Sequence, residues 1–274
     1  LLKGLLALQL FKFEDNQIYH MPPFFGGDEF DPDMEARVND VTGLNFTVVT
    51  DGNRLADYLP EGIELLRPEL AISYCQLREV EFMAGSAYNL VQVSVPVRFN
   101  GKRDRLEGSF PLVIWENNTR PIIGGREESG QPKIFADIED LHIFGRKYST
   151  NVSFEGNTFL RLEMTEPQAL DDATLELAKA ASASYYMIGW RYIPKVGMPG
   201  AELSQAVLYP QGMTVTGAWA GKGTVQWTEL SFEQNPSQYK IIRGLAGLPV
   251  NAMGPAVLTK GAIVMKPFSG RVLE

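Results

Sequence analysis

Residues 124–133 read Gly-Gly-Arg-Glu-Glu-Ser-Gly-Gln-Pro-Lys and end in a lysine that directly follows a proline. The next three residues, 134–136, are apolar. An amine between a proline and an apolar run is expected to lie partly out of water, and burial disfavours its charged form. Lys133 is therefore a candidate nucleophile, because a neutral amine attacks a carbonyl carbon. The residues alone leave a second interpretation open, in which Lys133 is an ordinary surface lysine after a turn.

The sequence around this stretch has the pattern of many short strands separated by turn signals such as Asn100-Gly101. One long helix is expected from Asp171 to Ser184, and a shorter one from Asp51 to Tyr58. The pattern predicts an α+β fold, in which an antiparallel β-barrel or folded sheet carries a few outer helices. The strands are expected at residues 46–49, 70–77, 90–99, 110–115, 158–164, 206–209, 213–219 and 224–230.

The chain has no internal repeat, low-complexity tract or charged linker, so a single domain over residues 1–274 is expected. Within it, residues 1–40 are expected to form an N-terminal helix and an irregular arm. The leucine-rich run 1–11 is too short to cross a bilayer and lacks the features of a signal peptide. It suits a helix that packs on the domain or on a neighbouring subunit of a homo-oligomer. Residues 20–40 predict an irregular loop, either a lid or an ordered surface wrap.

Composition and charge narrow the classes of function. The net charge of −8 at pH 7, without a basic stripe, argues against nucleic acid as a partner, and no membrane association is expected. The single cysteine, Cys75, excludes an intrachain disulfide and favours a reducing, cytoplasmic compartment. His20 and His142 lack the spacing of metal ligands, so no metal site is expected. No glycine pattern typical of a nucleotide-binding loop is present, so no nucleotide cofactor is expected either.

The segment Gly125-Arg126-Glu127, followed by four residues and then Pro132-Lys133, resembles the signature of the acetoacetate decarboxylase family. The reactive lysine of that family forms a Schiff base with a ketone. Other segments follow in the family's order over about residues 41–268: 45–64, 88–101, 186–194, 218–221 and 248–250. The resemblance implies a closed, cone-shaped β-barrel with Lys133 pointing into its interior.

The chemistry that this resemblance implies is that of a lyase. Neutral Lys133 attacks the carbonyl group of a β-keto acid or related oxo compound, and the resulting iminium draws electrons from the adjacent bond. Protonation and hydrolysis of the enamine complete a decarboxylation, whereas attack of the enamine on an aldehyde gives an aldol condensation and dehydration. Neither route requires a cofactor, because the protonated imine is itself the electron sink.

Several positions depart from the family's pattern. In the family's name-giving enzyme a second lysine directly follows the reactive one, and its charge helps to lower the pKa of the reactive amine. Here Ile134 takes that place. Two glutamates of the family's pocket fall at Leu90 and Ser73. The pocket is therefore expected to be more apolar and to take a larger, less polar substrate than acetoacetate. A non-catalytic barrel that binds an apolar small molecule stays open as an alternative.

The remaining candidate residues each have two interpretations. Arg126 can pair with a substrate carboxylate or hold the segment that carries Lys133. Glu127 can relay protons, although an ion pair with Arg126 is favoured. Gln131 is a candidate to hydrogen-bond a carbonyl oxygen. Aromatic residues are candidate pocket walls or ordinary core residues, namely Tyr88, Tyr148, Trp219 and Tyr239.

Overall fold

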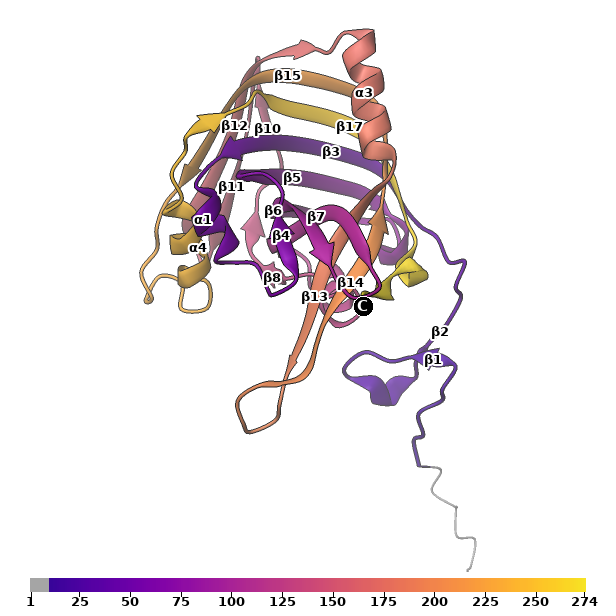
Figure 1. The fold of residues 1–274 in the computed structure, drawn as a ribbon. Helices are drawn as coiled ribbons and strands as arrows, with labels where there is room; N and C mark the ends of the chain where they lie inside the picture. Colours follow the sequence, from indigo (N-terminus) through magenta and orange to yellow (C-terminus); the bar gives the residue numbers. More distant parts are fainter. Residues whose placement is uncertain (1–9) are drawn as a thin grey trace, which may run out of the picture.

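The computed structural model describes residues 10–274, most of which belong to one large, curved sheet (Figure 1). The sheet of this described part contains 16 strands. Its main path runs through β10 (His142–Phe144), β11 (Lys147–Phe154), β12 (Asn157–Ala169), β15 (Met213–Trp227), β17 (Ala256–Met265), β3 (Ala36–Val49), β5 (Glu69–Val80), β6 (Ser86–Asn100), β7 (Arg105–Glu116), β13 (Tyr185–Pro194), β14 (Ala201–Gln211) and β18 (Arg271–Val272).

Four short strands extend this path. They are β4 (Ile63–Leu65) beside β6, β8 (Lys133–Phe135) beside β7, β9 (Asp137–Ile138) beside β11 and β16 (Ala252–Met253) beside β3. β7 pairs in parallel with β8 and β13, whereas the other strand pairs are antiparallel. The two ends of the path, β10 and β18, do not pair with each other within residues 10–274. The predicted sheet with outer helices is confirmed, but no closed barrel is found.

The two faces of the sheet bury different sets of side chains, because successive residues of a strand point to opposite faces. On β5, Ile72 and Tyr74 belong to the main core, whereas Leu77 belongs to a second cluster and Cys75 packs against it. Trp115 of β7 is fully buried in the main core. Tyr88 of β6 lies in the second cluster. The second face is the one that carries the candidate site.

Four α-helices occur in the described residues, and three of them begin with a capping side chain. They are α1 (Gly52–Ala56), α2 (Thr119–Glu127), α3 (Asp172–Ala183) and α4 (Tyr239–Ala246). The predicted helices at 171–184 and 51–58 are confirmed as α3 and α1, capped by Asp171 and Asp51. α2, capped by Asn118, and α4 were not predicted from the sequence. The proline and paired glycines of α2 are turn signals in most contexts, which explains why it was missed.

Some predicted strand boundaries were wrong. The strands expected at 213–219 and 224–230 are one continuous strand, β15, which ends at Trp227. β11, β13 and β17 were not predicted at all. The loop expected over residues 20–40 ends earlier, because β3 begins at Ala36. Pairing between strands that are far apart in the sequence decides these boundaries, and it cannot be inferred from local composition.

The arm before β3 contains the short strands β1 (Gln17–Ile18) and β2 (Asp28–Glu29), which pair with each other. Most of the helix expected over residues 1–11 falls on residues 1–9, outside the described part. His20 Nε2 lies 2.5 Å from Oε1 of Glu128, so the arm contacts the segment between α2 and β8. Three 3₁₀ turns complete the fold: Pro23–Phe25, Glu81–Met83 and Pro267–Ser269. Among residues 10–274, no helix combines the length and apolar character needed to span a bilayer.

Candidate active site

Lys133 is the first residue of β8, and it pairs in parallel register with Ile114 of β7. Residues in register on neighbouring strands share a face of the sheet, and residues two apart on one strand do as well. Lys133 therefore shares its face with Ile114 and Glu116. Its side chain is only 12% exposed, so it is not the surface lysine that the residues alone left open.

The amine of Lys133 has two polar neighbours. Nζ lies 2.9 Å from Oε1 of Glu116 and donates a hydrogen bond of 3.1 Å to the carbonyl oxygen of Pro121. The Glu116 side chain is 0% exposed, and its Oε2 has no hydrogen-bond partner among the described residues. Burial raises the pKa of the Glu116 carboxyl, although the charge of Lys133 and its hydrogen bond act in the opposite direction.

Helix α2 packs directly against the lysine side chain through a glycine. A Cβ atom at Gly125 would lie 2.5 Å from Cδ and 2.6 Å from Cε of Lys133. Carbon atoms in contact normally stay about 3.5–4.0 Å apart. The absence of a side chain at Gly125 therefore leaves room for the lysine side chain whose amine contacts Glu116.

The other residues of the motif hold the backbone around Lys133. Arg126 Nη1 donates a 2.8 Å hydrogen bond to the carbonyl oxygen of Lys133. No ion pair joins Arg126 to Glu127 within residues 10–274. The backbone N–H of Gln131 donates to the carbonyl oxygen of Gly125 at 2.9 Å, and the Gln131 side chain is buried. These contacts fix the end of α2 against the start of β8.

Three other predicted residues lie on the same face of the sheet as Lys133. Leu90 of β6 pairs with Glu116 of β7, and residues of an antiparallel pair point to one face. Tyr88 lies two residues before Leu90 on that face, and Ser73 is placed there by its pairing with Gln92. The pKa of Tyr88 is raised well above its ordinary value, first by burial and then by the negative charge of Glu116.

The remaining candidates lie elsewhere. Ile134 packs against the main core, on the face opposite to Lys133. Tyr148 and Trp219 also pack against the main core, and Tyr239 begins α4. Ile134 therefore replaces the family's second lysine with an apolar side chain that is directed away from the amine.

Glu116 is a functional candidate that was not predicted from the sequence. Its sequence signal is a glutamate at the end of an apolar strand, which also fits an exposed strand end. Its proximity to Lys133 depends on two strand registers, β6 with β7 and β7 with β8. The family's pattern places acids at the positions of Leu90 and Ser73, whereas the structure supplies one directly across from Leu90.

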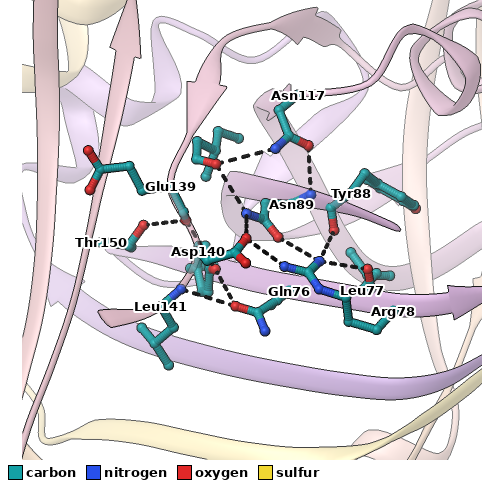
Figure 2. Close-up of polar contacts among 12 residues, drawn as sticks. Gln76, Leu77, Arg78, Tyr88, Asn89, Asn117, Glu139, Asp140, Leu141 and Thr150 are labelled. Atoms are coloured by element: carbon teal, nitrogen blue, oxygen red, sulfur yellow. Dashed lines mark hydrogen bonds and ion pairs between the residues drawn. The ribbon is translucent and has the colours of Figure 1, made fainter. Parts of the chain in front are cut away.

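A polar network fixes the strand end that carries Glu116 (Figure 2). The backbone N–H of Asn89 donates to Oδ1 of Asn117 at 2.7 Å, next to Glu116 in the chain. The side chain of Asn89 donates to Oδ1 of Asp140 at 2.8 Å and accepts from Nη1 of Arg78 at 3.0 Å. The hydrogen bond from Asn89 and the contact with Arg78 hold the pKa of Asp140 below its ordinary value. This network ties β5, β6 and the end of β7 to the segment after β9.

A cavity of about 350 Å³ with a mostly apolar lining lies next to the segment that carries Lys133. Lys133 does not line it. The described residues contain no cluster of three His, Cys, Asp or Glu side chains that is suited to a metal ion. The lining comes from that segment, from β7 and β13 and from α4, and it includes Pro132, Phe110, Trp190, Ile241 and Leu245.

Comparison with known proteins identifies decarboxylases among the relatives of this chain. The family model for acetoacetate decarboxylase matches residues 20–264. The chain is 25% identical over 187 residues to an acetoacetate decarboxylase of Burkholderia multivorans, covering 67% of this chain and 70% of the relative. It is 28% identical over 196 residues to decarboxylase DEC1 of Cochliobolus heterostrophus, covering 70% and 73%. The fold matches the crystal structure of an acetoacetate decarboxylase from Legionella pneumophila with a TM-score of 0.71, at 20% identity and over 91% and 92% of the two chains.

Proposed function

The chain belongs to the acetoacetate decarboxylase family, and on this basis we propose that it is a lyase that forms a Schiff base through Lys133. The observation that carries the proposal is the position of the amine, largely buried and within 2.9 Å of a carboxylate. Burial and an adjacent group that can take a proton are both means by which proteins activate a lysine nucleophile.

In the proposed reaction, the amine of Lys133 adds to the carbonyl carbon of a β-keto acid. Loss of water gives an iminium, which accepts the electron pair of the bond to the carboxylate as carbon dioxide leaves. The enamine then takes a proton at carbon, and water hydrolyses the imine to release the ketone and the lysine. If the enamine attacks an aldehyde instead, the outcome is an aldol condensation followed by dehydration.

We propose a substrate that is larger and less polar than acetoacetate. The apolar side chains of Leu90 and Ile114 share a face of the sheet with Lys133 and support this proposal. Arg126 and Gln131 are proposed to hold the segment that carries the nucleophile. Glu127, Ser73 and Tyr88 are proposed to lie around the substrate.

We also propose a homo-oligomer and a sheet that encloses the Lys133 face as a cone. The hairpin between β13 and β14 projects from the body (Figure 1). Exposed apolar side chains on this hairpin and on the arm support a subunit contact. Phe25 is 92% exposed and Val196 is fully exposed. Burial of such residues at a subunit contact would remove apolar surface from water.

Trapping with borohydride tests the proposed function. The protein is incubated with a panel of ketones and β-keto acids of increasing acyl length, reduced, digested and examined by mass spectrometry. A stable adduct is expected on the peptide that contains Lys133, and it should be absent in Lys133→Ala. Lys147→Met is a matched control, because Lys147 pairs with Glu163 and is 43% exposed.

An unlabelled Lys133 across the whole panel would contradict the proposal. In that case, reversible binding of an apolar compound that survives Lys133→Ala would favour the alternative of a non-catalytic binding protein.

A further inference from the structure

We propose that Glu116 is the catalytic proton acceptor and donor for Lys133 during formation and hydrolysis of the imine. This inference rests on the proposed function, and it assigns the acid–base group that the motif itself does not contain. Its basis is the contact of 2.9 Å between Nζ of Lys133 and Oε1 of a side chain that is 0% exposed.

Only one of the two polar groups that contact the amine can take its proton. Nζ contacts Glu116 and the carbonyl oxygen of Pro121. A backbone carbonyl accepts a hydrogen bond but does not take a proton at ordinary pH, whereas a carboxylate does. Oε2 of Glu116 has no hydrogen-bond partner among residues 10–274, so the carboxylate keeps free acceptor capacity.

Lys133, Glu116 and the substrate together account for every proton that moves in this step. An ammonium at Lys133 passes one proton to Glu116, and the neutral amine forms a bond to the carbonyl carbon. The amine hydrogen moves to the former carbonyl oxygen, which gives a carbinolamine. Glu116 then returns its proton to the hydroxyl group, the C–O bond breaks, water leaves, and the iminium faces a carboxylate again. Hydrolysis runs through the same steps in reverse order.

Burial favours this exchange. A carboxyl group that lies out of water holds a proton more readily, and its pKa is raised by that burial. A base is most effective when its pKa lies near the working pH. The position of Glu116 is also fixed, because the adjacent Asn117 is held by Asn89 and by the carbonyl oxygen of Ile138.

Other titratable groups on this face are poor substitutes for Glu116. Burial raises the pKa of Tyr88 of β6, and the charge of Glu116 raises it further. Cys75 of β5 and Tyr209 of β14 act in the same direction. Burial raises the pKa of Cys75 and of Tyr209 to about 12. All three are therefore neutral near pH 7, and Glu116 is the group expected to control the acid side of a pH profile.

The test measures the rate of imine formation at Lys133 by timed borohydride trapping with a ketone that labels the wild-type protein. Glu116→Gln keeps the shape of the side chain and removes its basic oxygen. Trapping is expected to slow by about 10²–10⁴-fold, the range typical of general acid–base catalysis. Glu107→Gln is the matched control on the same strand, because Glu107 pairs with Arg98 at the surface and is expected to leave the rate unchanged.

Two further readouts separate proton transfer from a merely structural role. The pH at which the wild-type rate rises on the acid side should shift in Glu116→Gln, because the proton of Lys133 then has to pass to solvent instead of to a carboxylate. Formate should restore part of the rate in Glu116→Ala, because it supplies a carboxylate to the space that the substitution opens. Circular dichroism of each variant establishes that it is folded, and Glu116→Ala without formate serves in place of Glu116→Gln if the latter does not fold.

Each outcome decides the inference. Wild-type labelling together with an unchanged rate in Glu116→Gln would overturn the role of Glu116 and leave the proposed function intact. The absence of any formate effect, with the acid limb at an unchanged pH in a folded variant, would do the same. If no ketone labels the wild-type protein, the proposed function fails, and the role of Glu116 fails with it.

Discussion

Replacing Gly125 by alanine should separate the stability of the fold from the reactivity of Lys133. The new Cβ would lie 2.5 Å from Cδ and 2.6 Å from Cε of the lysine. Ordinary carbon contacts are about 3.5–4.0 Å, so these atoms have to move apart by roughly 1 Å. The lysine side chain is the flexible partner, and its displacement carries the amine away from Glu116 and from the carbonyl oxygen of Pro121.

The expected magnitudes differ for the two properties. Alanine is favoured over glycine within a helix by up to about 1 kcal/mol, which offsets part of the cost of moving the lysine away from Glu116, so the free energy of unfolding should fall by less than the roughly 3–5 kcal/mol expected when the lysine is removed. A misplacement of about 1 Å at a reacting group can lower a rate by roughly 10²-fold. Gly125→Ala is therefore expected to fold normally and to be trapped by borohydride about 10²-fold more slowly.

Gly124→Ala is a matched control for this substitution. A Cβ atom at Gly124 meets only Oε1 of Glu128, at 4.0 Å, so it should stabilise α2 without slowing the trapping. In the Lys133→Ala background the clash at Gly125 is absent, and the gain from alanine should appear in full in urea unfolding. Equal trapping rates for Gly125→Ala and the wild-type protein, or equal slowing by both alanine variants, would show that the close approach of α2 to the lysine does not control its reactivity.

Three further predictions concern the buried pair of Lys133 and Glu116, the hydrogen bond of Arg126, and Asp140 of the polar network. Replacing both members of the buried pair, Lys133→Met with Glu116→Leu, should leave the free energy of unfolding unchanged or raise it by about 1–4 kcal/mol, whereas Lys133→Met alone should lower it by about 3–5 kcal/mol in urea unfolding. Arg126→Gln should slow trapping of a neutral ketone and of a β-keto acid by the same factor, about tenfold, because its hydrogen bond holds the backbone of Lys133; a loss confined to the β-keto acid would indicate a contact with the substrate carboxylate. The hydrogen bond from Asn89 lowers the pKa of Asp140 below 3.8. The contribution of the ionised Asp140 to the free energy of unfolding is therefore present above pH 3.8 and is lost as the pH falls further. Acid unfolding should therefore be less steep in Asp140→Asn, and an identical pH dependence in both proteins would contradict this account.

The proposed nucleophile could be singled out from the sequence because its signature is local. Proline, lysine and the preceding glycine, arginine and glutamate lie within nine residues. Helix α3 could be predicted for the same reason, since Asp171 caps it and no residue interrupts it. Helix α2 was missed because Gly124 and Gly125 oppose helix formation in isolation. Packing of α2 against β8 overrides that local preference.

The carboxylate could not be predicted, because its position depends on strand register. Glu116 and Lys133 are neighbours only when β8 pairs in parallel with β7. A shift of one residue in that pairing would turn one of the two side chains to the opposite face. The register depends on buried contacts such as those of Trp115 with Phe159 and Gln238, two residues that lie far from the motif in sequence.

The cost of the buried pair bears on the choice between an enzyme and a binding protein. Glu116 is fully buried with one oxygen unpaired, and Lys133 is its only charged partner among the described residues. Apolar residues in place of such a pair are often neutral or stabilising, so a protein that only holds an apolar molecule gains nothing from it. Imine chemistry, in contrast, requires a nucleophilic amine and a group that exchanges its proton. The glycine that gives the lysine room and the network that fixes the strand end of Glu116 both maintain this contact, which supports the proposed lyase over a protein that only binds.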